Sequence, residues 1–349
     1  MHIDDLETPV LVVDIVGLEN NITRLQSYLD EHGIANRPHI KTHKIPAIAQ
    51  MQRDAGAVGI TCQKIGEAEV MADAGIEDIF LPYNILGRAK IARLMEVARR
   101  TKLSVTTDSM KVAKGLSKSA QEANLTLSVL IECDLGYGRC GVQTPAEAGD
   151  LARFVHALPN LQFHGLMTYP NSKNLDDFVR ETRSMLKPDG IAIQIVSGGG
   201  SACMWQAHTH KELTEHRAGM YIFGDRNLLR AGAMTLDDIA FGVIATVVSR
   251  PTADRGILDC GSKTLSSDTL GLEGYGYLRE YPEAMIYNLS EEHGFLDLSE
   301  CKRKPELGER VTVIPNHCCP VVNLSDELIG VRDNVLVKRW LVTARGKVQ

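Results

Sequence analysis

Eight short apolar runs alternate with longer amphipathic stretches between about residues 36 and 223, and this alternation constrains the fold more than any other feature. The stretches between the runs, such as KIGEAEVMADAG, repeat apolar residues at helical spacing. The runs lie at 37–41, 58–61, 78–82, 103–107, 127–133, 163–168, 192–197 and 219–223. Eight strands with helical crossovers favour a closed (β/α)₈ barrel over the alternative, an open doubly wound sheet.

The chain changes character after about residue 235. FGVIATVVSRP, RGILDCG, ERVTVIP and NVLVKRWLV are strand-like runs separated by turns, without helical periods between them. This pattern predicts an antiparallel β domain after the barrel, with which the opening segment ETPVLVVDI can pair. The predicted division is a barrel at 15–232 and a β domain made of 1–14 plus 233–349.

Composition narrows the function classes. A net charge of -6 argues against nucleic-acid binding, and no apolar run approaches the length of a membrane span. The start MHIDDLETP lacks a signal-peptide pattern, so a cytoplasmic location is expected. The absence of any CxxC spacing excludes a structural zinc finger, although His317 followed by Cys318 and Cys319 stands out.

Polar residues close several of the predicted barrel strands, where active sites of such barrels gather. Lys41 ends the first, Arg139 lies in the loop after the fifth, Tyr169 follows the sixth, and SGGGSA (197–202) follows the seventh. Three glycines let backbone N–H groups approach an anion, so SGGGSA is typical of a phosphate cradle. A lysine amine opposite a phosphate cradle, with arginine and aromatic side chains between them, predicts a pyridoxal phosphate site.

Four motifs in order, RPHIKTHK, DLGYGRCG, SGGGS and PNHCCPVVN, also carry a family resemblance. The chain resembles the D-threonine aldolase and D-serine dehydratase group of alanine-racemase-like, fold type III pyridoxal phosphate enzymes. The resemblance runs over essentially the whole chain. It implies a barrel followed by a β domain.

The resemblance implies roles for single residues. Lys41, not Lys44, would form the Schiff base with the cofactor. Arg139 would face the pyridine nitrogen and keep it unprotonated, because two adjacent positive charges repel; Arg217 is the rival for this role. The remaining cofactor candidates are Tyr169 near the ring and Ser197, Gly198, Gly199 and Tyr221 near the phosphate.

PNHCCPVVN is interpreted as a metal site. On an extended segment His317 and Cys319 project to one face, and an imidazole with a thiolate suits zinc. The resemblance implies a metal here, with His-x-Asp in aldolases, which prefer manganese or magnesium, and His-x-Cys with zinc in dehydratases. The chain departs from the aldolase pattern at Cys319. Asp268 and His293, in segments that also resemble family elements, are candidates for reaching an active site, that of a neighbouring subunit included, with strand-capping turns as the alternative.

The predicted activity is that of a pyridoxal phosphate- and divalent metal-dependent lyase acting on β-hydroxy-D-amino acids. D-Threonine aldolase-type cleavage to glycine and an aldehyde is favoured over dehydration of D-serine or 3-hydroxy-D-aspartate. His43 or metal-bound water is the candidate base for cleavage, and Lys41 for dehydration. A metal-free racemase and a non-catalytic pyridoxal phosphate-binding protein are more distant alternatives. A homodimer is expected.

Overall fold

The computed structural model describes residues 1–349, which form two compact units. The barrel unit comprises residues Leu25–Lys41, Pro46–Gly219 and Lys347–Gln349. The β unit comprises Met1–Arg24, Thr42–Ile45 and Met220–Gly346. Helix α1 (Ile15–Glu31) is divided between the units, as is the segment after Lys41. These bounds differ from the predicted division at residues 15–24, 42–45 and 220–232, which belong to the β unit, and at residues 347–349, which belong to the barrel unit.

Eight parallel strands form the barrel unit, in the order β2-β9-β8-β7-β6-β5-β4-β3. A bridge between His39 and Thr61 joins the chain after β2 to β3, and the Thr61 N–H donates to the Pro38 carbonyl at 2.8 Å. This pairing links the two ends of the sheet, so the predicted closed barrel is confirmed and the open sheet is excluded. The strands are β2 (Ala35–Asn36), β3 (Ile60–Thr61), β4 (Asp78–Leu81), β5 (Lys102–Thr107), β6 (Leu127–Cys133), β7 (Leu161–Thr168), β8 (Ile195–Gly198) and β9 (Glu215–His216).

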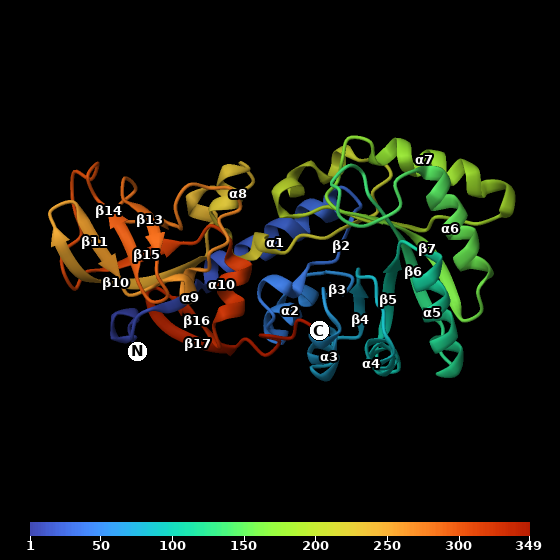
Figure 1. Ribbon diagram of the computed structural model, residues 1–349, viewed down its shortest axis with the longest axis horizontal. Coiled ribbons are helices and arrows are strands. Elements are labelled where there is room, and N and C mark those ends of the chain that lie inside the picture. The colour runs from blue at the N-terminus through green and yellow to red at the C-terminus, as the bar shows by residue number, and fades with distance from the viewer. The chain divides into compact units, whose positions relative to one another are not determined.

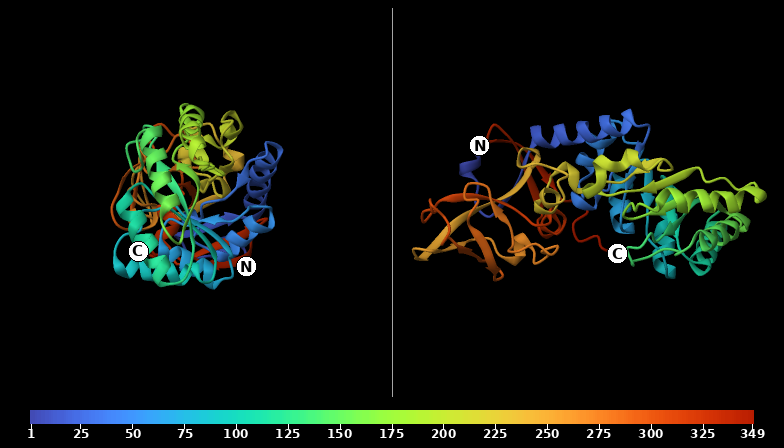
Figure 2. Two further views of the ribbon diagram at one scale, coloured as in Figure 1. Left: turned by 90° about the vertical axis from the view of Figure 1, so that its right-hand side faces the viewer. Right: turned by 90° about the horizontal axis from the view of Figure 1, so that it is seen from above.

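Amphipathic helices cover the outside of this barrel, as Figure 1 shows for strands β3 to β7 and as the left view of Figure 2 shows from another side. Several begin at good capping sites: Thr144 caps α6 with Glu147 completing a capping box, and Ser109 caps α5. The helices are α2 (Pro46–Asp54), α3 (Ile65–Asp73), α4 (Arg88–Ala98), α5 (Met110–Glu122), α6 (Pro145–Ala157) and α7 (Leu175–Leu186), with the 3₁₀ segment η4 (Ser201–Thr209) after β8.

The predicted eighth strand at 219–223 is wrong. The last barrel strand is β9, and residues Met220–Ile222 form a 3₁₀ turn, η5, of the β unit. Glu215 and His216 already pair with both β2 and β8, which completes the ring. The chain then turns at Gly219, whose N–H donates to Ser201 Oγ at 3.0 Å. The apolar run that follows, residues 220–223, is buried by side-chain packing in the β unit and is not part of a β-strand.

The β unit is a nine-stranded sheet ordered β11-β14-β13-β12-β15-β10-β1-β16-β17, in which β10 also pairs with β11. Six of its strands therefore form a closed antiparallel ring, extended by β1, β16 and β17. The opening segment joins this sheet as predicted, because β1 pairs antiparallel with β10 and parallel with β16. The strands are β1 (Val10–Asp14), β10 (Phe241–Thr252), β11 (Arg255–Leu258), β12 (Tyr277–Leu278), β13 (Met285–Leu289), β14 (Gly294–Asp297), β15 (Arg310–Ile314), β16 (Glu327–Arg332) and β17 (Val335–Leu341).

Three short helices belong to the same unit: α8 (Arg226–Arg230), α9 (Ser262–Leu265) and α10 (Cys318–Leu324). Helices α9 and α10 contact each other beside the sheet (Figure 1). Across the whole chain, no helix has both the length and the apolar character that crossing a bilayer requires.

Candidate active site

Lys41 lies just beyond the first barrel strand, in the 3₁₀ turn η2 (Ile40–Thr42). Its backbone N–H donates to His39 Nδ1 at 3.4 Å, and His39 Nε2 lies 3.0 Å from Gln63 Oε1. The Lys41 side chain is half-buried at the carboxyl end of the barrel, whereas Lys44 is buried and belongs to the β unit. The structure therefore places Lys41 where barrel enzymes carry their reactive groups.

Arg139 lies in the loop after β6, close to the end of β7. Its guanidinium carbon is 4.9 Å from the centre of the Tyr169 ring, and its Nη2 is 3.7 Å from Glu132 Oε1. The Arg139 side chain is 44% exposed, while that of Glu132 is 5% exposed. Burial raises the pKa of Glu132 and Asp108 adds to the rise, whereas Arg139 and Arg217 oppose it. Arg139 and Tyr169, both predicted site residues, are thus brought together.

Arg217 lies inside the barrel, where neighbouring residues of the same unit accept its hydrogen bonds. It donates to Ser197 Oγ at 2.6 Å and to the Thr168 carbonyl at 2.9 Å, and its guanidinium lies 5.7 Å from the Phe80 ring centre. Burial lowers the pKa of Arg217 to about 10, although Glu215 and Glu132 act in the opposite direction. Of the two rival arginines, Arg139 is the one with an accessible guanidinium.

Ser197 belongs to the same interior network. Its hydroxyl donates to Glu215 Oε1 at 2.5 Å, and Glu215 Oε2 accepts from Arg37 Nε at 2.6 Å. The Ser197 hydroxyl already serves Glu215 and Arg217, whereas the Ser201 hydroxyl accepts the Gly219 N–H at 3.0 Å and keeps its own proton for donation. Strand alternation places Ser197, Glu215 and Arg217 on the inner face, which sequence spacing alone did not reveal.

The glycine loop after β8 has the backbone that a phosphate cradle needs. Gly199 has a φ of +93°, and a Cβ at this position would lie 2.1 Å from Cε1 of His216. A Cβ at Gly198 would lie 2.2 Å from Asn171 Oδ1. Only glycine fits at these two positions, because a side chain would collide with the buried groups behind the loop.

His216 and Asn171 were missed by sequence reasoning. His216 is fully buried, and neither of its ring nitrogens has a hydrogen-bond partner. Burial lowers its pKa to about 3, with Arg217 and His210 adding to the effect. Both amide atoms of Asn171 are likewise buried without a partner. His216 was missed because the eighth strand was predicted at 219–223, whereas the observed last strand, β9, contains His216.

Two of the residues that were predicted on the barrel, Tyr221 and His43, lie in the β unit. Tyr221 is buried in η5 and not on a barrel strand. His43 is fully buried, and its Nδ1 accepts from the Ile45 N–H at 3.1 Å. In the neutral imidazole this bond leaves the proton on Nε2, which is then a donor. His43 is therefore poorly prepared to act as a base in this arrangement.

The predicted extended segment around His317 is wrong. His317 is the N-cap of α10, and Cys319 lies in the first turn of that helix. The Cys318 N–H donates to Asp225 Oδ2 at 3.1 Å, and Asp225 also caps α8 through the Leu228 N–H at 3.0 Å. This buried carboxylate holds the first turn of α10, since it satisfies one of the free amide groups there.

His317 and Cys319 nevertheless lie close together. His317 Nδ1 is 2.8 Å from Asp268 Oδ2, and the Cys319 thiol is 3.2 Å from Thr42 Oγ1. Burial lowers the pKa of His317, but hydrogen bonds to Cys319 and Asp268 outweigh it and raise the pKa to about 9. No group of three or more His, Cys, Asp or Glu side chains is arranged to hold a metal ion. A metal here would need water or substrate oxygens for its other ligands.

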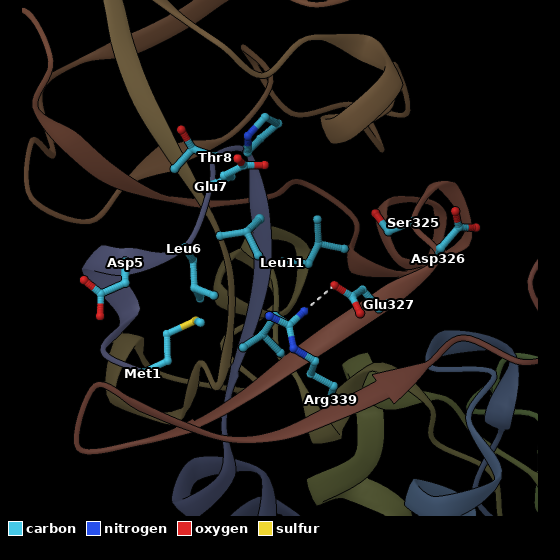
Figure 3. A pocket seen from close by; sticks show the side chains of 13 residues that line it. Met1, Asp5, Leu6, Glu7, Thr8, Leu11, Ser325, Asp326, Glu327 and Arg339 are labelled. Carbon is cyan, nitrogen blue, oxygen red and sulfur yellow. Dashed lines mark hydrogen bonds and ion pairs between the residues drawn. The ribbon is translucent and has the colours of Figure 1, made fainter.

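Neither His293 nor a separate hollow of the β unit belongs to the cluster formed by His317, Cys319 and Asp268. His293 lies in the turn 290–293, with Nδ1 3.5 Å from Ser290 Oγ. Figure 3 shows the hollow, formed in the β unit by the N-terminal segment and strands β16 and β17, where Glu327 pairs with Arg339 at 2.7 Å. It contains no predicted site residue.

Comparison with known proteins shows the family. Residues 13–227 match the family described as alanine racemase, N-terminal domain, and residues 240–331 match a putative serine dehydratase domain. The chain belongs to the alanine racemase-like family. The predicted resemblance and fold class are confirmed, and so is the predicted enzyme class, since homologues are pyridoxal phosphate-dependent lyases.

Full-length relatives include both reaction types. A D-threonine aldolase from an Arthrobacter species is 34% identical and aligns with 98% of this chain and 93% of its own length. A D-threo-3-hydroxyaspartate dehydratase from a Delftia strain is 29% identical over 90% of this chain and 91% of its own. The solved D-threonine aldolase of Filomicrobium marinum superposes with a TM-score of 0.91 at 31% identity, covering 99% of this chain and 97% of that one.

The barrel unit fits the cofactor of this family. The glycine loop offers backbone N–H groups beside buried polar atoms of His216 and Asn171. Lys41 and the Arg139–Tyr169 pair lie at the ends of other strands of the same barrel. Pyridoxal phosphate enzymes supply an amine for the aldehyde, a cradle for the phosphate and a carboxylate or guanidinium for the ring nitrogen, and residues of each kind are present here.

Proposed function

We propose that this protein is a pyridoxal phosphate- and divalent metal-dependent lyase that cleaves β-hydroxy-D-amino acids of the D-threonine type to glycine and an aldehyde. The observation that carries the proposal is the accessible Arg139 guanidinium on the Tyr169 ring, in the same barrel as Lys41 and the glycine loop. The full-length similarity to D-threonine aldolases supports it.

Each residue of the barrel unit has a defined task in this proposal. The Lys41 amine would carry the cofactor, and the backbone of Gly198 and Gly199 with the Ser201 hydroxyl would bind its phosphate. Arg139 would pair with the pyridine nitrogen and keep it unprotonated, because a second positive charge beside a guanidinium is unfavourable. Tyr169 holds Arg139 in place by its ring face. Pyridoxal phosphate, when bound, supplies the electron sink for negative charge at Cα.

In the β unit, we propose that His317 and Cys319 bind one divalent metal ion, zinc by preference because of the thiolate ligand. Such an ion supplies a Lewis acid for the β-oxygen of the substrate. Asp268 orients His317 through its 2.8 Å contact, as carboxylates do for metal-binding histidines. Thr42, whose hydroxyl contacts the Cys319 thiol, follows Lys41 directly in the sequence.

Dehydration of D-serine or 3-hydroxy-D-aspartate is the second candidate. It is favoured by the Cys319 thiol beside His317, because the dehydratase pattern is His-x-Cys, and by the match to a serine dehydratase domain. The state of His43 also favours dehydration. Cleavage needs a base at the β-oxygen, and His43, with its proton on Nε2, is poorly prepared for that role. Dehydration needs a base at Cα instead, and the Lys41 amine is available for it.

Product identification separates the two reactions. Protein loaded with pyridoxal phosphate and zinc is incubated with D-threonine, D-serine and 3-hydroxy-D-aspartate. We expect glycine and acetaldehyde from D-threonine. Formation of a 2-oxo acid and ammonia without glycine would replace the first proposal by the second. A cytoplasmic location and a homodimeric assembly stay predictions, for which fractionation and sedimentation are the tests.

A further inference from the structure

Asp134 organises the loop that carries Arg139. It follows β6 directly, is 6% exposed, and accepts three consecutive backbone N–H groups. The Gly136 and Tyr137 N–H groups donate to Oδ1 at 2.9 and 2.7 Å, and the Gly138 N–H donates to Oδ2 at 2.8 Å. Both carboxylate oxygens are therefore used inside the loop, which is the arrangement of a charge-assisted turn.

The backbone of this loop depends on the carboxylate and on glycine. Gly136 and Gly138 have φ values of +105° and +76°. A Cβ at Gly141, where φ is +119°, would lie 2.6 Å from the Asp134 nitrogen. At the base, the Val142 N–H donates to the Glu132 carbonyl at 2.9 Å. The loop is thus closed at its base and held at its centre by one side chain.

The residues that the loop presents have little burial to fix them. Tyr137 is 58% exposed and the Arg139 side chain is 44% exposed. The Tyr137 ring meets the Tyr169 ring edge-on at 5.7 Å, and Arg139 lies on the same Tyr169 ring at 4.9 Å. Tyr169 and Glu132 contact the Arg139 side chain, but a partly exposed side chain reaches such partners only from the position that its backbone gives it.

We propose that Asp134 is the positioning residue that fixes Arg139 on Tyr169 through the loop backbone. The inference rests on the proposed function for the role of Arg139 toward the cofactor, but the loop geometry stands without it. Burial raises the pKa of Asp134, but the three amide donors outweigh burial and hold the pKa below its usual range. The carboxylate therefore stays charged, which strengthens all three bonds.

A double-mutant cycle with Asp134→Asn and Arg139→Ala tests the proposal in the cofactor-loaded protein. Asparagine keeps one acceptor but loses the charge and turns an amide donor toward the loop N–H groups. We expect Asp134→Asn to change the visible circular dichroism of the bound cofactor in the same direction as Arg139→Ala, and to lower kcat by up to about 100-fold. In the Arg139→Ala background, adding Asp134→Asn should change kcat by less than about 2-fold, as expected for coupled sites.

Two further variants separate positioning from general damage. Gly138→Ala keeps Asp134 and meets no atom within 4 Å, but strains a φ of +76°, so it should reproduce the Asp134→Asn spectrum. Asp297→Asn removes a comparable carboxylate of the β unit, which accepts the Ser299 N–H at 2.9 Å, and should leave spectrum and kcat unchanged. The proposal would be overturned if Asp134→Asn lowered kcat as much in the Arg139→Ala variant as it does in the wild-type protein.

A readout without cofactor keeps this test apart from that of the proposed function. Trypsin cuts after arginine, so the rate of cleavage after Arg139 in the cofactor-free protein reports the order of the loop. We expect Asp134→Asn to raise that rate at least about 10-fold, the factor set by losing roughly 1.4 kcal/mol of local protection. An unchanged rate would overturn the inference about Asp134 even if the protein proves to be the proposed lyase, and a raised rate would support it even if no lyase activity is found.

Discussion

The two candidate sites of this protein are built in different ways. In the barrel unit, the candidate cofactor residues follow the ends of parallel strands, so their order along the chain also describes their places around the barrel. In the β unit, His317 and Cys319 lie at the start of a short helix and Asp268 comes from a distant turn. Parallel strands collect their carboxyl ends at one edge, whereas an antiparallel sheet has no such edge.

This difference determines which motifs can be interpreted without coordinates. A glycine loop after a strand indicates an anion site wherever the strand lies in the sheet. A histidine and a cysteine two positions apart do not indicate a metal site in the same way, because the directions of their side chains depend on whether the segment is extended or helical. Four experiments test how far the contrast holds.

Lys41 should show the largest effect. Lys41→Ala removes the amine that lies just beyond the first barrel strand, so lyase activity should fall at least about 1,000-fold, in line with the loss of a principal catalytic group. Borohydride reduction and peptide mapping should find the pyridoxyl group on Lys41. Lys263→Ala is the control, because that amine is exposed and pairs with Glu291 at 2.8 Å and Glu292 at 3.0 Å. A label on Lys44 or Lys263 would refute the assignment.

The second largest effect is expected at the proposed metal ligands. His317→Ala and Cys319→Ala should each lower bound metal below one equivalent and reduce activity by about 100-fold or more, while the cofactor absorption band persists. Metal analysis and absorption spectra measure both. Cys301→Ala, a buried thiol of the same unit, is the control. Cys319→Asp should shift the preference toward manganese or magnesium. Full activity of Cys319→Ala after chelation would leave a metal-free enzyme.

A smaller effect is expected at Gly199. Alanine there would strain a φ of +93° and press on the His216 ring, which costs about 1–3 kcal/mol, or roughly 10- to 100-fold in cofactor affinity. Equilibrium binding of pyridoxal phosphate measures it. Gly190→Ala carries similar backbone strain at φ +68° with no atom within 4 Å, so it should not change cofactor affinity. Equal losses in both variants would show that the glycine loop is not the phosphate cradle.

The smallest effect concerns the pH dependence of stability. His216 has a pKa of about 3 in the folded protein against about 6.5 when unfolded, so the unfolded chain binds the extra proton below pH 6.5. The free energy of unfolding should therefore fall by about 2 kcal/mol from this group between pH 7.5 and 5. His216→Leu should remove that loss in urea unfolding. His156→Leu, at an exposed position of α6, should keep it. Identical pH dependence in wild type and His216→Leu would contradict the burial argument.

The sequence by itself determined the alternation of strands and helices in the barrel, the β domain after it, the family, and most of the residues that follow strand ends. Strand β6 was predicted at its observed bounds, 127–133, because its apolar run is continuous and bounded by polar residues. Lys41, Arg139, Tyr169 and the glycine loop were predicted by the same logic, and each lies at or beyond the end of a barrel strand. These features are local, and hydrophobic periodicity with turn chemistry records them directly.

Only the tertiary structure decided which side chains share a surface. Ser197 and Arg217 point into the barrel, where Ser197 donates to Glu215 and Arg217 donates to the Thr168 carbonyl. His216 lies between Glu215 and Arg217 in the sequence, but it packs behind the glycine loop. Likewise, Asp225 stabilises the helix start that brings His317 and Cys319 together, although Asp225 and His317 lie far apart in the sequence. Such relations depend on strand register and long-range hydrogen bonds. A one-residue slip reverses a strand's inner and outer faces, so periodicity along one segment cannot specify its partners on another.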